Sequence, residues 1–327
     1  MKYRFYCSVC IFLIICSFFG CKPNPPASPP TVELSVVQIY DIIKNYDYWY
    51  YSFDGSVKAF KENEEISLQG EKRICDIQFV DGWIYYVKAY DDYSGGFDIC
   101  RVRPNGEDSS VFFNSAEFED TEHTFASFNR FEFVDGYMYI QASLVLYQYD
   151  MLTKTVNQID GDISTYHIID NRLYFIGHAR KDFTIYIKNL ETEETEILLG
   201  DGVYGHDKGY PKLYYRDFLF IGDTMYYTKG IERSADDYFV ELFRYENGES
   251  TLIDSTDNYR EFSIFEHDGR LGYMVWKDEA YRLMQYNPDD GQKTETATCN
   301  DYKSGAKIKN GYFYYLNSED NVQQVRI

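Results

Sequence analysis

The chain has 327 residues, of which 44% are hydrophobic and 19% aromatic, and its formal net charge is −21. This much apolar and aromatic side chain excludes a disordered protein, and one all-β domain can run to this length. A charge this negative repels phosphate backbones, so nucleic acid is excluded as a partner.

Residues 1–20 have the pattern of a secretion signal. Lys2 and Arg4 form a short basic segment, residues 9–19 form an apolar run, and Gly20 precedes Cys21. This junction resembles the lipobox of bacterial lipoproteins, which implies cleavage before Cys21 and lipidation of its thiol. An uncleaved membrane anchor is the alternative, but the run is shorter than the roughly 20 residues that a spanning helix needs.

Residues 21–30 hold five of the eight prolines in the chain. Proline joins neither a helix interior nor a strand ladder, so we expect an extended tether between the lipid and a domain at residues 31–327. An anionic bilayer would repel this acidic domain, so attachment must come from the lipid. These features predict a protein that is lipid-anchored to the bacterial cell membrane and faces outside the cytoplasm.

Seven aromatic hexads divide the domain. Their first residues lie 35 to 54 positions apart, and the fifth position is Tyr except in the sixth hexad, where it is Gly272. Asp-Gly and Asn-Gly pairs favour tight hairpin turns, and the aromatic run behind them favours a strand. The hexads span residues 46–51, 81–86, 135–140, 170–175, 222–227, 268–273 and 310–315.

A second turn sequence follows several hexads, as at residues 104–106 and 288–291. Each repeat then has room for four antiparallel strands, and such units at this period predict an all-β fold, a β-propeller with seven blades. Six blades is the alternative, if the first or sixth hexad is not the core of a true blade. The seventh repeat lacks an outermost strand, and we expect residues 31–35 to supply it and close the ring.

Aromatic and apolar residues on both faces of the hexad strands suit sheets that pack between neighbouring blades, so hexad tyrosines are predicted to be core residues. Of seven cysteines, only Cys75, Cys100 and Cys299 belong to the domain. Cys75 and Cys100 lie in strand-like segments and are predicted to be small buried hydrophobes rather than a disulfide or a metal site.

The hexads, with residues 49–51 and 83–86 nearest to type, resemble the Tyr-Trp-Thr-Asp propeller repeats of low-density-lipoprotein-receptor-related proteins. They are more similar to a bacterial domain of unknown function that is likened to those propellers and often found on lipoproteins. The resemblance covers residues 31–327 and implies a β-propeller. It implies no catalytic residues. The receptor ligands are not carried over, because the Thr-Asp pair is absent and those propellers have six blades.

Familiar enzyme motifs are missing: the sequence has no Gly-x-Ser-x-Gly, no His-Glu-x-x-His and no phosphate or dinucleotide loop. Acidic pairs such as Asp91-Asp92 lack the spacing of a calcium loop, and no metal or cofactor is predicted. Propeller glycosidases and lyases gather carboxylates around the axis, so a carboxylate-based carbohydrate-active enzyme is an alternative for a chain with 53 acidic residues.

In a four-stranded antiparallel blade, successive turns alternate between the two faces of the ring. The links between blades and the loops between second and third strands therefore lie on the same face. The longest lie at residues 88–97, 114–127, 200–212 and 229–238, and long loops on a rigid scaffold often carry binding residues. Aromatics among acids there could stack on sugars or hold a cationic peptide or amine. The candidate binding residues are Tyr93, Glu119, Asp120, His123, Tyr204, His206, Asp207, Tyr210, Asp236 and Tyr238.

The leading hypothesis is therefore a lipid-anchored binding module of the cell envelope, whose partner is an envelope protein, a peptide or a glycan. The runner-up is the carbohydrate-active enzyme, a glycosidase or lyase. The third is a structural assembly partner in the envelope that binds no small ligand.

Overall fold

The fold of the domain comes from a computed structural model. It describes residues 31–45, 48–53, 56–61, 64–69, 74–90, 96–118, 128–177, 184–200, 212–234, 237–257, 262–299, 301–309, 311–319 and 322–327. Residues 1–30, with Cys21 and the predicted signal and tether, lie outside the described residues. Within the described ranges, no helix is both long and apolar enough to cross a membrane.

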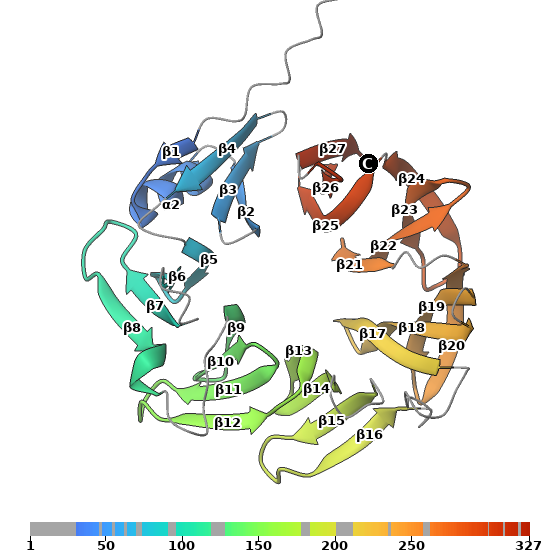
Figure 1. Ribbon diagram of the computed structural model, residues 1–327, viewed down its shortest axis with the longest axis horizontal. Helices are drawn as coiled ribbons and strands as arrows, with labels where there is room; N and C mark the ends of the chain where they lie inside the picture. Colours follow the sequence, from blue (N-terminus) through green and yellow to red (C-terminus); the bar gives the residue numbers. More distant parts are fainter. Residues whose placement is uncertain are drawn as a thin grey trace, which may run out of the picture.

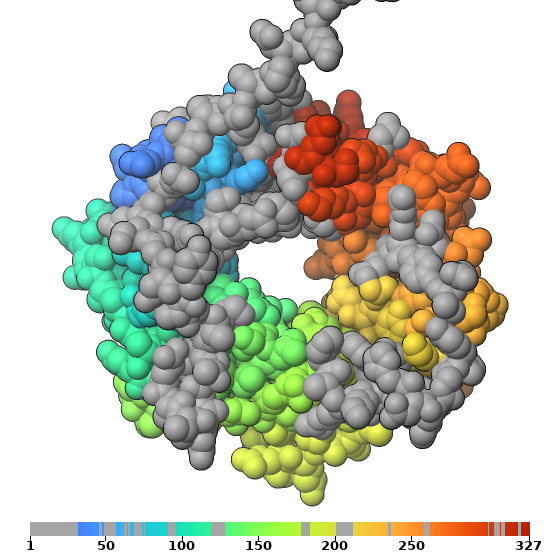
Figure 2. Space-filling view, viewed as in Figure 1, coloured from blue at the N-terminus to red at the C-terminus, as the bar shows by residue number. Residues whose placement is uncertain are grey.

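Seven β-sheets stand in a ring around a central axis, so the seven-bladed propeller is confirmed over the six-bladed alternative (Figure 1). The five sheets of blades 2 to 6 each contain four antiparallel strands in chain order, with the first strand nearest the axis. Blade 2 contains β5 (Ile74–Val80), β6 (Trp83–Ala89), β7 (Phe97–Val102) and β8 (Ser110–Asn114), followed by the 3-10 turn η1 (Ser115–Glu117). Figure 2 shows an open passage at the centre of the ring.

The next four blades repeat this plan. Blade 3 contains β9 (Phe128–Val134), β10 (Tyr137–Ala142), β11 (Val145–Asp150) and β12 (Val156–Asp160). Blade 4 contains β13 (Ile163–Ile169), β14 (Arg172–Gly177), β15 (Ile185–Asn189) and β16 (Thr195–Leu199). Blade 5 contains β17 (Lys212–Ile221), β18 (Thr224–Ser234), β19 (Asp237–Glu246) and β20 (Glu249–Thr256). Blade 6 contains β21 (Ser263–His267), β22 (Arg270–Lys277), β23 (Ala280–Tyr286) and β24 (Lys293–Cys299).

In blades 2 to 6, each hexad forms the turn between the first two strands of the blade and most of the second strand. In blade 1 the strand part of the hexad is instead the innermost strand, β2 (Trp49–Phe53). Asp81 and Gly82 both have positive φ, at 49° and 73°, which is the backbone of a tight type I′ hairpin turn and explains the Asp-Gly pair. Asp135 with Gly136, and Asp268 with Gly269, repeat this conformation. The predicted turn-and-strand role of the hexads is thereby confirmed.

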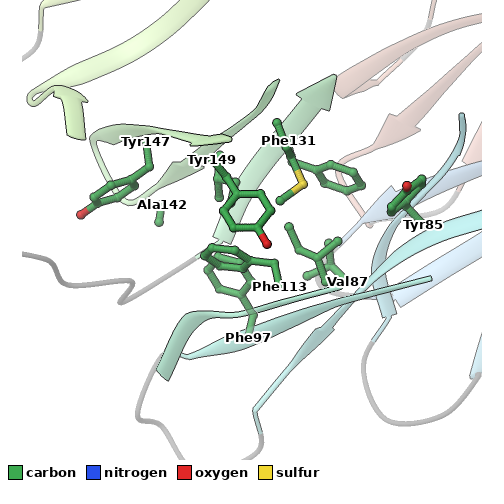
Figure 3. Packing of buried hydrophobic residues seen from close by; sticks show 11 residues of the cluster. Tyr85, Val87, Phe97, Phe113, Phe131, Ala142, Tyr147 and Tyr149 are labelled. Atoms are coloured by element: carbon green, nitrogen blue, oxygen red, sulfur yellow. The ribbon is translucent and has the colours of Figure 1, made fainter. Parts of the chain in front are cut away.

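Aromatic side chains of the hexad strands fill the seams between blades. Tyr85 of blade 2 is buried and lies 4.6 Å, ring centre to ring centre, from Phe133 of blade 3. Figure 3 shows Tyr85 together with Phe131 and Tyr149 of blade 3 in the buried cluster that the two blades share. The fifth hexad residue faces the next blade in this way, whereas the sixth, such as Tyr86, packs toward the preceding one. Most of the described hexad tyrosines therefore belong to the core, as predicted, and Tyr137 is an exception with 36% of its surface exposed. Cys100 is a buried free thiol, also as predicted.

Blade 1 is built differently from the others. It contains β2 (Trp49–Phe53), β3 (Ser56–Lys61) and β4 (Glu64–Gln69), and β1 (Thr31–Glu33) lies parallel to the outer edge of β4. The helix α2 (Val36–Asn45) follows β1 and was not anticipated by an all-β interpretation. It buries Val36 and Ile39 in the apolar cluster shared by blades 1 and 2.

Blade 7 contains three strands within the described residues: β25 (Tyr302–Lys309), β26 (Tyr312–Asn317) and β27 (Val322–Arg326). The predicted closure therefore needs correction, because β1 pairs with β4 of blade 1 and does not complete blade 7. The reason is the short connection between β1 and α2. Since α2 is held in the seam between blades 1 and 2, β1 is kept beside blade 1 (Figure 1).

Candidate functional site

The residues that the sequence singles out for binding lie almost entirely outside the described residues. These are Tyr93, Glu119, Asp120, His123, Tyr204, His206, Asp207, Tyr210 and Asp236. Tyr238 is described, and its predicted place in a long loop is wrong: β18 and β19 extend through most of residues 229–238. Tyr238 therefore lies near the start of β19 with only 4% of its surface exposed. Its surroundings therefore define what the structure says about the loop-bearing face.

Tyr238 belongs to a compact polar and aromatic group on blade 5. Arg216 Nη1 donates a hydrogen bond of 2.6 Å to the Tyr238 hydroxyl oxygen, and the Tyr214 ring is stacked on the Tyr238 ring with centres 5.9 Å apart. Gly230 lies between them on β18, where a Cβ would come within 2.6 Å of the Tyr214 ring. The absence of a side chain at Gly230 thus lets two rings from β17 and β19 meet across β18.

The same group includes an ion pair, Lys212 Nζ to Glu232 Oε2 at 3.4 Å. We call Lys212, Tyr214, Arg216, Glu232 and Tyr238 the blade 5 platform. Burial, followed by the hydrogen bond with Tyr238, raises the pKa of Tyr214, so the Tyr214 hydroxyl stays a neutral hydrogen-bonding group at physiological pH. The buried Tyr238 thus holds the Arg216 guanidinium and the Tyr214 ring in fixed positions.

The platform is carried on the longest strands described. β17, β18 and β19 have 10, 11 and 10 residues, and their extra length lies at the ends opposite the turn at Gly222 and Asp223. Three extra residues in a strand correspond to about 10 Å. The extension points to the face of the blade links and second-to-third strand loops. Residues 201–211, with four of the predicted binding residues, directly precede β17 in the chain.

A second polar group lies on the first strands of blades 3, 4 and 5, which surround the axis (Figure 1). We call Arg130, Glu132, Tyr166, His167 and Asp217 the inner-strand cluster. Arg130 Nη2 and Glu132 Oε2 are 3.2 Å apart on β9, and the Arg130 guanidinium carbon lies 4.1 Å from the ring centre of Tyr166 on β13. The cluster therefore spans the seam between blades 3 and 4.

Burial shifts the proton affinity of each acid and of the histidine in this cluster. It raises the pKa of Asp217 to about 6, although the Phe218 N–H, which donates to Asp217 Oδ1 at 2.9 Å, and the charge of Arg130 oppose the shift. Burial also raises the pKa of Glu132 and lowers that of His167, which Arg130 lowers further. Acids with raised pKa values and a histidine with a lowered pKa are typical of functional sites, and they also occur in structural networks.

Repetition of the contacts favours a structural role for the cluster. His167 Nε2 lies 3.1 Å from the carbonyl oxygen of Phe218 on the next blade. Gln78 occupies the matching register position in blade 2, opposite Tyr85 as His167 is opposite Tyr174, and its Nε2 donates 2.7 Å to the carbonyl of Phe131. The same kind of hydrogen bond thus joins blade 2 to blade 3 and blade 4 to blade 5. This is expected for a contact that stabilises the ring.

No group of three or more His, Cys, Asp or Glu side chains in the described part of the chain is arranged to hold a metal ion. Of the members of these two polar groups, only Tyr238 was singled out from the sequence. Their members lie in strands of one to three blades, and the register that brings them together is not visible in local sequence.

The ring and its strand order define the class of the protein, a seven-bladed β-propeller. No family model matches the sequence. A search of curated proteins also gave no match. Similarity to known proteins is therefore found at the level of the fold.

Several solved propellers are similar in fold. The β-propeller domain of the Trilobed protease from Pyrococcus furiosus, with an open velcro topology, has a TM-score of 0.51 at 14% identity over 77% of this chain and 81% of that one. The extracellular domain of a one-component system from B. thetaiotaomicron has a TM-score of 0.51 at 10% identity, over 85% of this chain and 36% of that one. The tricorn protease has a TM-score of 0.51 at 11% identity, over 86% and 32%. At these identities the similarity establishes the fold alone.

Proposed function

We propose that the protein is a lipid-anchored binding module of the bacterial cell envelope that presents the loop-bearing face of its propeller to a partner. The observation that carries this proposal is the blade 5 extension. It is a rigid three-stranded projection on the same face as the long loops, and it bears the platform of Tyr214, Arg216 and Tyr238.

The chemistry of the platform supports recognition of a protein, a peptide or a glycan. Tyrosine and arginine are the residue types that dominate the binding energy of protein interfaces, because they combine large contact area with hydrogen bonding. The contacts among Tyr214, Arg216 and Tyr238 hold these groups in place before a partner arrives. Pre-positioned groups lose less conformational entropy on binding.

The binding proposal is tested by affinity capture from envelope membranes, with the tagged full-length protein produced in a bacterial host. Changing Tyr204, His206, Asp207 and Tyr210 together to Ala should abolish capture, and Arg216→Gln should weaken it about tenfold. A matched control changes Glu191 and Asp289 to Ala, on turns of the opposite face. Normal capture by both loop-face variants would place the binding surface elsewhere.

Anchoring is tested separately. Cys21→Ala should abolish incorporation of labelled palmitate, because the lipid-bearing thiol is gone, while Cys100→Ala in the buried core should leave labelling unchanged. Equal labelling of the Cys21→Ala variant and the wild type would overturn the lipoprotein part of the proposal.

A carboxylate-based carbohydrate-active enzyme is the second candidate, and one observation favours it. Glu132 and Asp217 both have raised pKa values on strands around the axis, as the acid of a glycosidase requires. Multiple-turnover cleavage of a glycan by the wild type, lost in Glu132→Gln and Asp217→Asn, would rank the enzyme first. No cleavage, together with partner capture, would leave the binding module.

A further inference from the structure

The seam between blades 6 and 7 lacks an aromatic ring that other described seams have. The fifth hexad residue is a tyrosine in blades 2, 3, 4, 5 and 7 of the described chain, and in blades 2 to 5 it packs in the cluster shared with the next blade. These tyrosines are Tyr85, Tyr139, Tyr174, Tyr226 and Tyr314. In blade 6 the same position is Gly272, and it faces blade 7.

The glycine is required by its neighbour. A Cβ at Gly272 would overlap the ring of Phe265, which is its cross-strand partner on β21. Phe265 turns toward blade 7, where its ring centre is 5.6 Å from that of Phe313. The Phe265 ring thus covers the glycine backbone without extending outward as a tyrosine at position 272 would.

A pocket of about 510 Å³ lies in this seam. Blade 6 contributes Phe265, Gly272, Leu283 and Gln285 to its wall, and blade 7 contributes Ile308. His267 and Asp268 also line it, and their side chains lie 3.7 Å apart. Polar and apolar atoms line the pocket in similar amounts, and its volume lies in the range of small-ligand sites.

One polar group of the pocket has a counterpart that shows what it can bind. In blade 3, Gln148 Nε2 donates a hydrogen bond of 2.8 Å to the hydroxyl of Tyr139, which is its cross-strand partner. The matching pair in blade 6 is Gly272 and Gln285. In the part of the chain that the structure describes, no protein group hydrogen-bonds the Gln285 amide. The amide is present, but the phenol that its counterpart binds is missing.

We propose that the seam pocket binds a phenolic ring, which takes the place of the tyrosine that blade 6 lacks. The ring packs against Phe265, Leu283 and Ile308, and the phenol oxygen accepts a hydrogen bond from Gln285 Nε2. The ligand is either a free phenol or a tyrosine side chain of a polypeptide. This site is independent of the proposed loop-face function, because the pocket is lined by Asp268 and Gly311, which belong to hexad turns on the opposite face.

The test is a binding titration of the full-length protein with p-cresol, with toluene as the probe that lacks the hydroxyl. A ligand of this size should bind with a dissociation constant on the order of 1 mM. Gln285→Leu should raise that constant about fivefold and leave toluene unaffected, because only the hydrogen bond is lost.

A second variant tests the location. Phe265→Leu with Gly272→Tyr copies the Leu219 and Tyr226 pair of blade 5 and puts a tyrosine ring into the pocket. It should fold with at least the wild-type melting temperature and bind no p-cresol. The variant and the wild type are titrated in the same detergent solution. Nonspecific uptake of the probe by the detergent is then equal in both and cancels in the comparison.

The outcomes are distinct. If N-acetyltyrosinamide binds at least as tightly as p-cresol, the site is assigned to a tyrosine of a polypeptide. If only p-cresol binds, the site is assigned to a free phenol. Unchanged p-cresol binding in the filled variant, or no binding to the wild type, would overturn the proposal. Equal binding of toluene and p-cresol would overturn the role of Gln285.

Discussion

His167 donates from Nε2 to the carbonyl oxygen of Phe218 across 3.1 Å, and this hydrogen bond joins the first strands of blades 4 and 5. Because the acceptor is a carbonyl, the Nε2 atom carries the proton, and the lowered pKa of His167 keeps the ring neutral. The first strand of a blade has no strand neighbour on its axial side, so side chains from the preceding blade satisfy part of its backbone.

Removing this link should destabilise the ring. His167→Ala leaves a half-buried carbonyl without its partner, and we expect a loss of about 1–3 kcal/mol in the free energy of unfolding. His167→Gln should lose less, since Gln78 makes the same bond to Phe131 in blade 2. Urea unfolding of the two variants measures the difference. Equal losses in both would contradict the hydrogen-bond explanation.

Asp217 should make stability depend on pH in the acid range. Its pKa is raised from 3.8 to about 6 in the folded state, so the folded protein holds a proton that the unfolded chain releases. The stability from this proton is fully present below about pH 4 and is lost as the pH rises through 6. Asp217→Asn should therefore be more stable than the wild type at pH 7, by roughly 3 kcal/mol, and nearly equal to it at pH 4.

Melting curves from pH 4 to pH 8 give the measurement. The Asn side chain keeps the oxygen that accepts from the Phe218 N–H, so the local backbone should not change. A variant that is less stable than the wild type at every pH would show that the Asp217 charge stabilises the fold.

Gly272 should tolerate no side chain while Phe265 is present. Gly272→Ala places a methyl group against the Phe265 ring, and overpacking of this kind costs about 1–3 kcal/mol. Gly161→Ala is the matched control, because the nearest atom to its added Cβ is the Gln158 amide at 3.8 Å. Thermal unfolding compares the two. Similar melting temperatures for both variants would mean that Phe265 moves away without cost.

The place of β1 can be tested by cross-linking. Val32 is the register partner of Leu68 on β4, so Val32→Cys with Leu68→Cys should form a disulfide in a background in which Cys75, Cys100 and Cys299 are changed to Ala. Val32→Cys with Val325→Cys, which would pair in a ring closed through β27, should stay reduced. Mass spectrometry after mild oxidation identifies the bond. The opposite result would restore closure through blade 7.

The repeat itself could be predicted because its signals are local. Pairs such as Asp81-Gly82 require the left-handed backbone that they adopt, and the aromatic residues after them are buried on both faces of the strand. The sixth hexad forms a true blade although Gly272 departs from its pattern, because the ring of its strand partner Phe265 covers the glycine backbone.

The start of the domain was predicted less well, although it carried a usable signal. Ser35 and Gln38 form a capping box, in which the Ser35 N–H donates 2.9 Å to Gln38 Oε1 and the Gln38 N–H donates 3.4 Å to Ser35 Oγ. Val36 and Ile39, three positions apart, lie on the buried side of the helix. Residues 31–35 have a strand-like sequence, and a strand was predicted there without the helix that follows it. The inner-strand cluster gave no such signal, because Arg130, His167 and Asp217 are brought together only by the ring.

The pairing of β1 with β4 has a consequence for how the protein folds. Apart from β1 with β4, every described strand pair joins strands that follow one another along the chain, and no pair joins the beginning of the domain to its end. Pairing of this kind has a low loop-closure cost, so each blade can form as soon as its own residues are available. During synthesis from the N-terminus, blade 1 can form before the residues of blade 7 are available, so that only side-chain packing is left to close the ring.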